Sequence, residues 1–481
     1  MNFKTVAKLL GALLVGIAIF MSTSIIPAAI SDGWSSILTF AISSILTAGV
    51  GLGLMHLGRQ ETGSIHAREA VAVVAIGWFT VSVFGGVPFF IEGTFSNPAD
   101  AFFESASGFT TTGSSVMTDI ESCSRSILYW RSLIQWLGGM GIIVLFIAVL
   151  PQLGVGARHL FKSEVPGPIT EGLKPKLKQT SAALWKIYLG ITSAMFLCLL
   201  LAGMDVYDAI CHSFTCMATG GFSTMNASIA HYDSVAIDII VTVFMAFAGI
   251  NFSLYYLLSR KRVKEVVTNR EFQVYIAINL IAMLVIAVSI LGRYPNFFTA
   301  LRYASFQTLA VSTTTGFATD NFDLYPSFTK ILMVALMCIG GSAGSTAGGM
   351  KISRIIIVVK AAYHEIYKAF QPHAVFSVKV GKQVIEDSVI RSVLVFFGVF
   401  ILSFIVGTLV MAAIGLDMVT AATSVVATLA NIGPGLAKVG AVENYAFIPW
   451  GGKLFLAFLM ILGRLELFSV LVLFIPDFWK R

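Results

Sequence analysis

The chain of 481 residues is 57% hydrophobic and only 12% charged, and its mean hydropathy is +0.85. Soluble globular domains carry about 25% charged residues, so this composition excludes an ordinary soluble protein. The net charge of +7 does not indicate nucleic-acid binding, because the basic residues form short clusters between apolar stretches. Repeated apolar stretches, each of about the 20 residues that span a bilayer, predict an all-α polytopic membrane protein.

Two apolar runs at the N-terminus predict a pair of transmembrane helices. The first covers about residues 9–30 and is longer than the apolar core of a secretory signal, so we expect a retained span. The second covers about residues 37–57. We assign residues 1–66 to this N-terminal pair.

The rest of the chain is predicted to repeat one plan four times: a long helix, a short helix, a glycine-bearing loop and a second long helix. The four pore repeats are 67–151, 152–262 (which begins with a linker), 263–382 and 383–481. The short helices are predicted at about 100–108, 205–218, 298–312 and 417–430. They are too short to cross a bilayer, so we expect re-entrant pore helices. The second long helices are predicted at about 127–150, 235–258, 328–339 (resuming at about 350) and 453–475.

Each repeat carries a run of small or hydroxyl residues that ends on a glycine. A single Thr-Gly pair is usually an ordinary turn, but four in register predict four-fold pseudo-symmetry around one pore. Glycine is expected there because carbonyls aimed at the axis need backbone angles closed to other residues. The predicted selectivity filter, which binds the cation through backbone carbonyls, consists of Thr111, Thr112, Gly113, Thr219, Gly220, Gly221, Thr314, Thr315, Gly316, Asn431, Ile432 and Gly433.

Each short helix runs toward its glycine loop, so its C-terminal end points at the predicted ion. The helix dipole places about half a negative charge there, which favours a cation. Asp100, Asp205 and Asp417 are predicted to cap the opposite ends, while the third helix begins near Asn296 without an acidic residue. His212, on the second short helix, is expected to be a hydrogen-bonded structural residue.

A glycine-rich segment interrupts the second long helix of the third repeat. Glycine costs about 1 kcal/mol per residue in a helix interior, so we expect an intramembrane loop below the filter. It has no phosphate-loop spacing, and a hinge without a gating function stays open as an alternative. The predicted gate consists of Gly340, Gly341, Ser342, Ala343, Gly344, Ser345, Thr346, Ala347, Gly348 and Gly349, together with Arg464.

Arg464 lies within the last predicted span. An arginine inside a membrane is costly and is by default functional or paired. It is expected either to bond carbonyls of the glycine-rich segment or to repel cations in a closed gate. Snorkelling to the cytoplasmic surface is the alternative. Glu466 is predicted to point to a different helix face and therefore not to pair with it.

Charge placement predicts the orientation of the chain, with both termini cytoplasmic under the positive-inside rule. The basic residues on the predicted cytoplasmic side are Lys4, Lys8, Arg158, Lys162, Lys174, Lys176, Lys178, Arg260, Lys261, Arg262, Lys264, Arg270, Lys360, Lys368, Lys379, Lys382, Arg391, Lys480 and Arg481. The acidic residues on the other side are Glu92, Asp100, Asp119, Glu121, Asp205, Asp233, Asp320, Asp323 and Glu443. Such an acidic rim would raise the local cation concentration at the pore mouth.

The four loops, the interruption at 340–349 and the Gly463-Arg464 pair together resemble the Trk/Ktr/HKT superfamily of potassium and sodium transporters. The similarity covers essentially the whole chain, and the N-terminal pair of spans points to TrkH-type membrane subunits rather than to KtrB. The resemblance implies a homodimer with one pore in each protomer. It also implies a cytosolic TrkA-like ring that binds a nucleotide (ATP/ADP or NAD), a potassium filter at the four glycines, and a gate at 340–349 with Arg464.

The expected function is therefore potassium uptake through a channel-like pore in a bacterial inner membrane, with no enzymatic activity and no cofactor in this chain. A sodium- or proton-coupled cation symporter is the alternative, but it needs carboxylates inside the membrane, and none is convincing in the predicted spans. A membrane enzyme is disfavoured because no catalytic cluster occurs. No loop reads Thr-Val-Gly-Tyr-Gly, which predicts fewer ordered carbonyl sites and weaker discrimination between potassium and sodium.

Overall fold

The structure is a computed structural model that describes residues 1–59, 67–148, 173–371, 377–381 and 383–480. The repeat boundaries predicted near residues 66, 151 and 382 lie outside these ranges, as do the basic residues Arg158, Lys162, Lys382 and Arg481.

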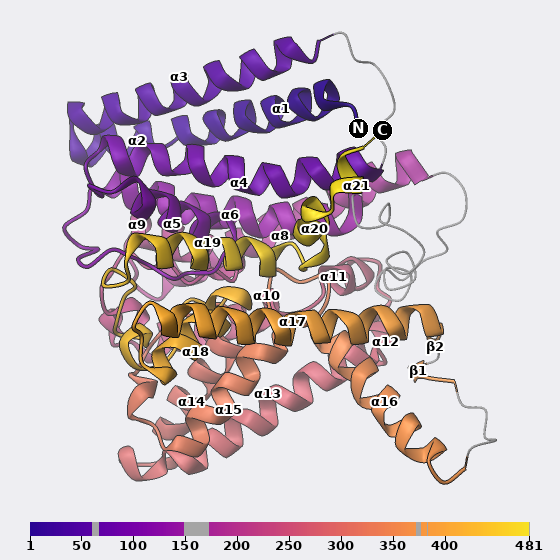
Figure 1. Cartoon of the computed structure of the whole chain (residues 1–481). Helices are drawn as coiled ribbons and strands as arrows, with labels where there is room; N and C mark the ends of the chain where they lie inside the picture. The colour runs from indigo at the N-terminus through magenta and orange to yellow at the C-terminus, as the bar shows by residue number, and fades with distance from the viewer. Residues whose placement is uncertain (60–66, 149–172, 372–376, 382, 481) are drawn as a thin grey trace.

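The chain folds into a helical membrane bundle, which confirms the predicted fold class. The N-terminal pair is α1 (Phe3–Ser22) and α3 (Trp34–Leu57), joined by α2 (Ile25–Pro27) and the π-helical turn η1 (Ala28–Asp32). In Figure 1 this pair lies along one edge of the bundle. The two helices approach closely at Gly11 and Gly51, where an added Cβ on Gly51 would lie 2.8 Å from the Gly11 carbonyl oxygen. Such small-residue contacts are typical of helix packing in membranes.

The four repeats follow the predicted order of elements. They contain α4 (Ala67–Ile91), α5 (Pro98–Phe109), α6 (Arg125–Ala148); α8 (Leu173–Leu201), α9 (Val206–Met217), α10 (Val235–Ala248), α11 (Phe252–Ser259); α13 (Arg270–Ser289), α14 (Phe297–Ser312), α15 (Ser327–Ile339), α16 (Ile352–Lys368); α17 (Asp387–Ala413), α18 (Met418–Leu429), α19 (Trp450–Arg464) and α20 (Phe468–Leu471). Among the described residues, six helices are long and apolar enough to cross a membrane, and two bent pairs raise this number to eight. The N-terminal pair and two long helices in each of four repeats predict ten spans, and α6 and the interrupted pair α15 and α16 are not among these eight.

Smaller elements join these helices. They are α12 (Val263–Val267), α21 (Pro476–Trp479), the 3-10 helices η3 (Ser228–Tyr232), η4 (Leu291–Arg293), η5 (Phe322–Leu324), η6 (Ala437–Val439) and η7 (Val472–Phe474), and the strands β1 (Lys379–Val380) and β2 (Gln383–Val384). The two strands form an antiparallel hairpin before α17, which an all-α prediction omits.

The prediction of continuous helices over 235–258 and 453–475 is wrong. The axes of α10 and α11 meet at 92°, and those of α19 and the segment from α20 onward meet at 114°. The first break is fixed by Asn251, whose side chain accepts a hydrogen bond from the Ser253 N–H at 2.8 Å and so begins a new helix. The second break contains Glu466 and Leu467, both at φ +58°. Apolar residues flank both breaks, so hydropathy alone does not show them.

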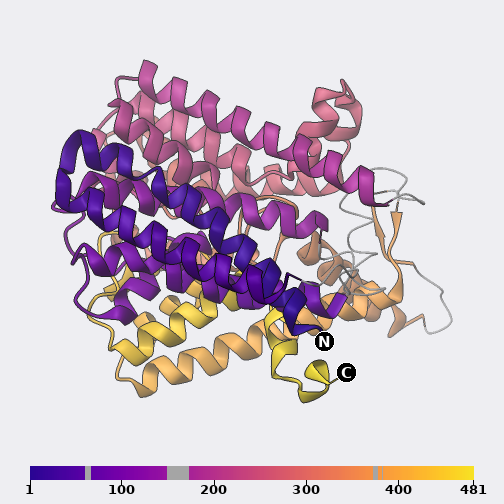
Figure 2. The ribbon, with the colours of Figure 1, turned by 90° about the horizontal axis from the view of Figure 1, so that it is seen from above.

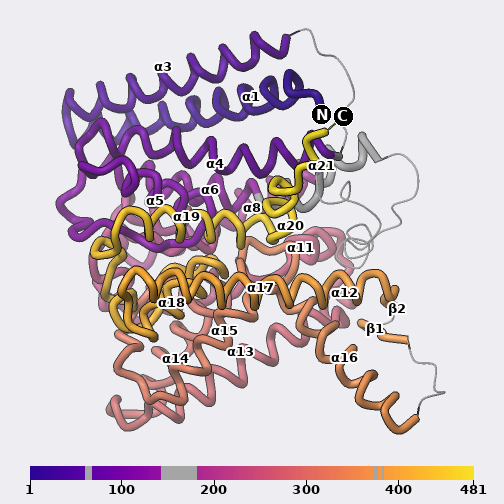
Figure 3. The backbone as a smooth tube through the Cα atoms, in the orientation of Figure 1, coloured from indigo at the N-terminus to yellow at the C-terminus, as the bar shows by residue number. Residues whose placement is uncertain are grey.

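The four pore helices gather at one end of the bundle, and both chain termini lie at the other end (Figures 1 and 2). The tube in Figure 3 shows α16 leaving the bundle at an angle at the end that holds the termini. Large apolar side chains cover the outside of the bundle, and examples are Ile45 (73% exposed), Leu201 (89%) and Leu409 (65%). This outer surface suits hydrocarbon and not water.

Candidate functional site: a ring of four pore loops and the loop beneath it

Two of the four pore helices begin at a predicted cap, Asp205 or Asp417, and the third begins at Asn296, which also caps its helix. Asp205, Asn296 and Asp417 each accept a hydrogen bond from a backbone N–H two or three residues further on, at 2.9 to 3.1 Å. The hydrogen bond from Thr420 lowers the pKa of the Asp417 carboxyl group below its usual value. These caps stabilise the helix ends that face away from the glycine loops.

The prediction that Asp100 caps the first pore helix is wrong. Pro98 occupies the first helical position, and the Asn97 side chain caps α5 by accepting from the Ala99 N–H at 2.9 Å. Asp100 lies within the first turn and forms an ion pair with the Lys453 ammonium group at 2.7 Å. It therefore links the first pore helix to α19 of the fourth repeat.

All four pore helices end in the same backbone conformation. The residue two positions before each glycine is left-handed: Thr111 (φ 52°), Thr219 (55°), Thr314 (56°) and Asn431 (56°). The next N–H then donates to a helix carbonyl five residues back at 2.8 Å in every repeat, which is the hydrogen bond of a Schellman end. A left-handed conformation costs about 1–2 kcal/mol for a residue other than glycine, so this shared conformation must be held by its surroundings.

The four predicted filter glycines lie against one another in a closed ring. An added Cβ on Gly113 would collide with the carbonyl oxygen of the second loop, one on Gly221 with that of the third, and one on Gly316 with that of the fourth. An added Cβ on Gly433 would lie 2.8 Å from the Thr112 carbonyl oxygen, which closes the ring at the first loop. All four glycines also have positive φ, between 72° and 104°. A side chain is therefore excluded at each position both by backbone angle and by space.

A hollow of about 150 Å³ lies at one opening of the ring. Gly113, Gly221, Gly316 and Gly433 all line it, together with outer-loop residues that include Glu443. One hollow that touches the same glycine of all four repeats is what a shared pore axis requires.

The ring is not fully symmetric in its hydrogen bonds. The Gly220 carbonyl accepts from the Gln135 amide at 2.7 Å, and the Gly433 carbonyl accepts from the hydroxyls of Tyr445 at 2.9 Å and Ser114 at 3.0 Å. These two predicted filter carbonyls therefore already have protein donors. Side chains also join the loops, since the Asn431 amide donates to the Thr112 hydroxyl at 2.9 Å.

The segment 340–349 is non-helical and buried, so the predicted interruption of the inner helix is confirmed. The helix ends at Ile339 and resumes at Ile352 rather than near residue 350. Gly340, Gly344 and Gly349 have φ between 69° and 75°, which explains the repeated glycines. Backbone N–H groups of Ser342, Ala343 and Gly348 donate to other parts of the protein, which is how non-helical backbone inside a membrane is satisfied.

This segment packs directly against the inner side of the predicted filter loops. The Gly348 N–H donates to the Thr314 hydroxyl at 2.7 Å, and the Gly349 N–H donates to the Ala430 carbonyl at 3.0 Å. The Thr346 hydroxyl donates to the Met217 carbonyl, at the end of the second pore helix, at 3.1 Å. The segment therefore contacts repeats two, three and four at the base of the ring.

Arg464 is 3% exposed and holds the same segment from the fourth repeat. Its guanidinium donates to the Thr346 carbonyl at 2.7 Å and to the Gly138 carbonyl, on α6, at 3.4 Å. The snorkelling alternative is therefore wrong, and the predicted bond to a carbonyl of the glycine-rich segment is present. Glu466 pairs with Arg354 on α16 instead, in line with its predicted direction.

Sequence reasoning missed Glu271, at the start of α13. Its carboxylate accepts from the Ala343 N–H at 2.7 Å and from the Ser353 N–H at 3.2 Å, so it ties the glycine-rich segment to the first turn of α16. In the sequence it resembles any acidic residue in the first turn of a helix, so no local signal marks it. The structure also buries Glu104 and Asp238, each in an ion pair with an arginine. The sequence predicts no convincing carboxylate in the spans, so neither of these two is expected from it.

His212 is buried and makes two hydrogen bonds, which confirms its expected structural role. Its Nδ1 contacts the Asp208 carbonyl at 2.8 Å and its Nε2 contacts the Ser223 hydroxyl at 2.9 Å. It therefore joins the second pore helix to the residues that follow Gly221.

The fold and the ring of loops define a polytopic membrane protein with four pore-loop repeats around one axis. The family model of TrkH, described as a cation transport protein, matches residues 36–481. The chain therefore belongs to the TrkH family of cation transport proteins.

Relatives match over the full chain. The Trk system potassium uptake protein TrkH of Escherichia coli (strain K12) is 38% identical over 491 residues, covering 100% of both chains. TrkG of the same organism, also named a Trk system potassium uptake protein, is 33% identical over 92% of both chains. The crystal structure of the potassium transporter TrkH from Vibrio parahaemolyticus matches with a TM-score of 0.90 and 34% identity, covering 100% of both chains.

Proposed function

We propose that this protein takes up potassium through a channel-like pore, with the four glycine loops as its selectivity filter. The observation that carries this proposal is the closed contact of Gly113, Gly221, Gly316 and Gly433, each at positive φ. Main-chain oxygens around such an axis replace the water shell of a cation, and no catalytic side chain is needed. Relatives named as potassium uptake proteins support potassium as the substrate.

The glycine-rich segment is the gate of this pore. It lies against the base of the ring, and Arg464 and Glu271 hold it through hydrogen bonds at 2.7 Å to Thr346 and Ala343. Opening requires these bonds to break or to move with the segment. The guanidinium of Arg464 also places a positive charge beside the predicted path, which disfavours a cation while the gate is closed.

The protein functions in the bacterial inner membrane as a homodimer with a cytosolic TrkA-like ring. Any nucleotide (ATP/ADP or NAD) binds to that ring, and this chain carries no cofactor of its own. Both termini are cytoplasmic. This is supported by the placement of the termini at the end of the bundle opposite the pore helices (Figure 2) and by the basic residues predicted on that side.

Uptake of rubidium into liposomes that contain the purified protein tests the proposal. A channel-like pore gives uptake that follows the rubidium gradient at equal pH and equal sodium on both sides. A sodium- or proton-coupled symporter gives uptake only when a gradient of the co-ion is imposed. Absence of rubidium uptake under every gradient would contradict transport through this chain alone.

A further inference from the structure

One pore-helix position recurs behind the filter in all four repeats. The residue nine positions before the ring glycine is Glu104, His212, Gln307 or Ser424. Glu104, His212 and Gln307 are each 0% exposed, and each contacts the segment that follows its own glycine. Only the first repeat uses a charge at this position.

The second and third repeats use neutral or hydrogen-bonding side chains here. His212 contacts the Ser223 hydroxyl at 2.9 Å, and the Gln307 amide lies within 3.4 Å of polar groups of Thr319 and Asp320. Each of these side chains spans from the pore helix to the descending part of its loop. The position therefore sets the distance between a pore helix and the loop residues beyond its glycine.

In the fourth repeat, the contact between the pore helix and the residues after its glycine is made by the residue one position earlier. Ser424 is too short and donates to Ala421 within its own helix at 2.9 Å. Thr423 takes its place, because its hydroxyl accepts a hydrogen bond from the Leu436 N–H at 3.0 Å. The equivalent contact is thus kept by a different side chain.

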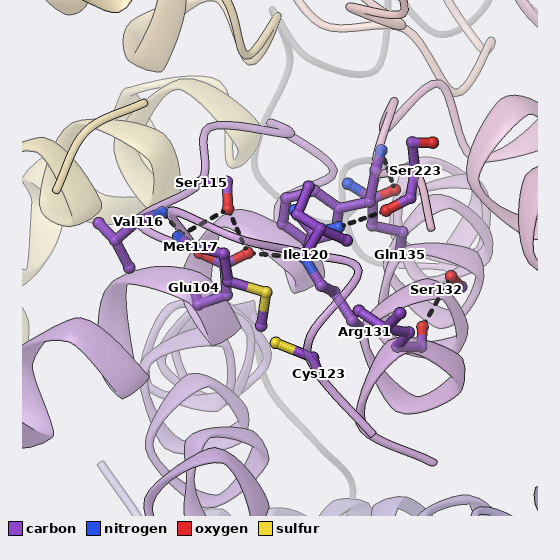
Figure 4. A network of polar contacts seen from close by, with 12 residues as sticks. Glu104, Ser115, Val116, Met117, Ile120, Cys123, Arg131, Ser132, Gln135 and Ser223 are labelled. Atoms are coloured by element: carbon purple, nitrogen blue, oxygen red, sulfur yellow. Dashed lines mark hydrogen bonds and ion pairs between the residues drawn. The ribbon is translucent and has the colours of Figure 1, made fainter. Parts of the chain in front are cut away.

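In the first repeat the contact is a buried ion pair. The Glu104 carboxylate accepts from the Ser115 hydroxyl and the Val116 N–H, both at 2.9 Å, and from the Arg131 Nε at 2.7 Å (Figure 4). The side chains of Glu104 and Arg131 are 0% and 3% exposed. A carboxylate with three donors is held in one position, because each charge-assisted bond is directional.

Arg131 extends this contact to the second loop. Its Nη1 donates to the Ser223 carbonyl at 2.9 Å, and its guanidinium lies 3.5 Å from the centre of the Phe222 ring. One turn further along α6, Gln135 accepts from the Phe222 N–H at 3.1 Å as well as donating to Gly220. The α6 helix therefore holds the second loop on both sides of Gly221.

We propose that the Glu104–Arg131 pair sets the ion selectivity of the pore by fixing the spacing between the first and second filter loops. This inference rests on the proposed function. The two residues are positioning residues, since they act on the ring through Val116, Ser223 and Phe222. Buried ion pairs contribute little net stability compared with apolar side chains of similar volume, so this pair is explained better by geometry than by stability.

A neutral double variant, Glu104→Gln with Arg131→Met, tests the inference, because it leaves no unpaired charge in the interior. We expect the variant to fold and to take up rubidium. We also expect the ratio of sodium to rubidium uptake to rise about tenfold, because a charge-assisted contact on each of two loops is lost. Arg131→Lys keeps the charge but lacks the fork of donors, so its ratio is expected to lie between those of the wild type and the double variant.

The matched control is Asp238→Asn with Arg302→Met. That pair also joins an arginine Nε to a carboxylate at 2.7 Å, but it links α10 to α14 away from the loops. We expect it to keep the wild-type ratio. An unchanged ratio in the double variant, or in Arg131→Lys if the double variant does not fold, overturns the inference. Failure of the wild type to take up rubidium would overturn the proposed function instead.

Discussion

The four glycine loops are alike in backbone conformation, whereas the second long helices of the four repeats, here called the inner helices, differ from one another in shape. The four loops share one backbone conformation, with a left-handed residue two positions before each glycine. The four inner helices differ: α6 is unbroken over its described residues, α10 and α11 bend by 92°, α15 and α16 are separated by residues 340–351, and α19 ends at a bend of 114°.

We interpret this difference as a division between two functions: the ring of loops binds the cation, and the segment beneath it closes the path. A ring that replaces a hydration shell needs equivalent groups on all sides of the ion, so symmetry is kept there. In the proposed pore, the segment that closes the path under the ring must come from one side and be held by the others. The third repeat supplies that segment, the fourth supplies Arg464, and the second supplies the Met217 carbonyl.

The largest expected effect comes from breaking the ring. Gly316→Ala places a Cβ against the Ile432 carbonyl at φ +79°, which costs about 1–2 kcal/mol in backbone energy before any displacement of the fourth loop. We expect rubidium uptake to fall by at least about tenfold.

Gly190→Ala is the control for that variant. It lies in α8, and no atom lies within 4 Å of an added Cβ. Alanine in a helix interior is favoured by about 0.5–1 kcal/mol over glycine, so the variant should fold and transport normally. Equal uptake by Gly316→Ala and Gly190→Ala would contradict the placement of Gly316 in the filter.

The second prediction removes the hydrogen bond by which Arg464 holds the proposed gate. Arg464→Met eliminates the hydrogen bond to the Thr346 carbonyl, and bonds of charged groups contribute about 1.5–3 kcal/mol. If the closed state depends on this bond, rubidium uptake should rise about tenfold. Thermal unfolding of the variant serves as the control for folding. A folded variant with unchanged or lower uptake would show that Arg464 does not hold the gate closed.

A smaller change at the same gate is Glu271→Gln. The amide keeps an acceptor for the Ala343 and Ser353 N–H groups but loses the charge, so each bond weakens by about half. We expect uptake to rise severalfold and amide hydrogen exchange at Ala343 to accelerate. Unchanged exchange at Ala343 would argue against a bond that restrains this segment.

The smallest effect concerns the start of the fourth pore helix, where Asp417 is the cap. Because the pKa of Asp417 is lowered in the folded protein, its contribution to stability is present above the unfolded pKa and is lost as pH falls through the folded pKa. Asp417→Asn keeps the cap and removes this titration. We expect the variant to lose part of the acid dependence of its melting temperature below about pH 4, without a change in uptake at neutral pH. An identical acid profile for wild type and variant would contradict a lowered pKa.

The sequence predicted the parts of this molecule that repeat. Four glycines in register indicated the ring, and the glycines of 340–349 indicated the interruption, because both patterns break a strong apolar background. The two bends are not predicted from the sequence, because Asn251 and Leu467 lie in stretches that are apolar enough to be taken for continuous transmembrane helices.

Long-range side-chain contacts were beyond sequence reasoning. Glu104 and Arg131 are far enough apart in sequence that only the packing of α5 against α6 shows their pairing. The place of Asp100 in the sequence predicts a cap, but the helix begins earlier, at Pro98, and the Asp100 carboxylate pairs with the Lys453 ammonium group.

A crystal structure of the protein grown with thallium ions tests the central claim most directly. Anomalous density is expected on the axis enclosed by Gly113, Gly221, Gly316 and Gly433, and Gly316→Ala should weaken it. Strong thallium density elsewhere in the protein, with none inside the ring, would contradict a filter built from these four loops.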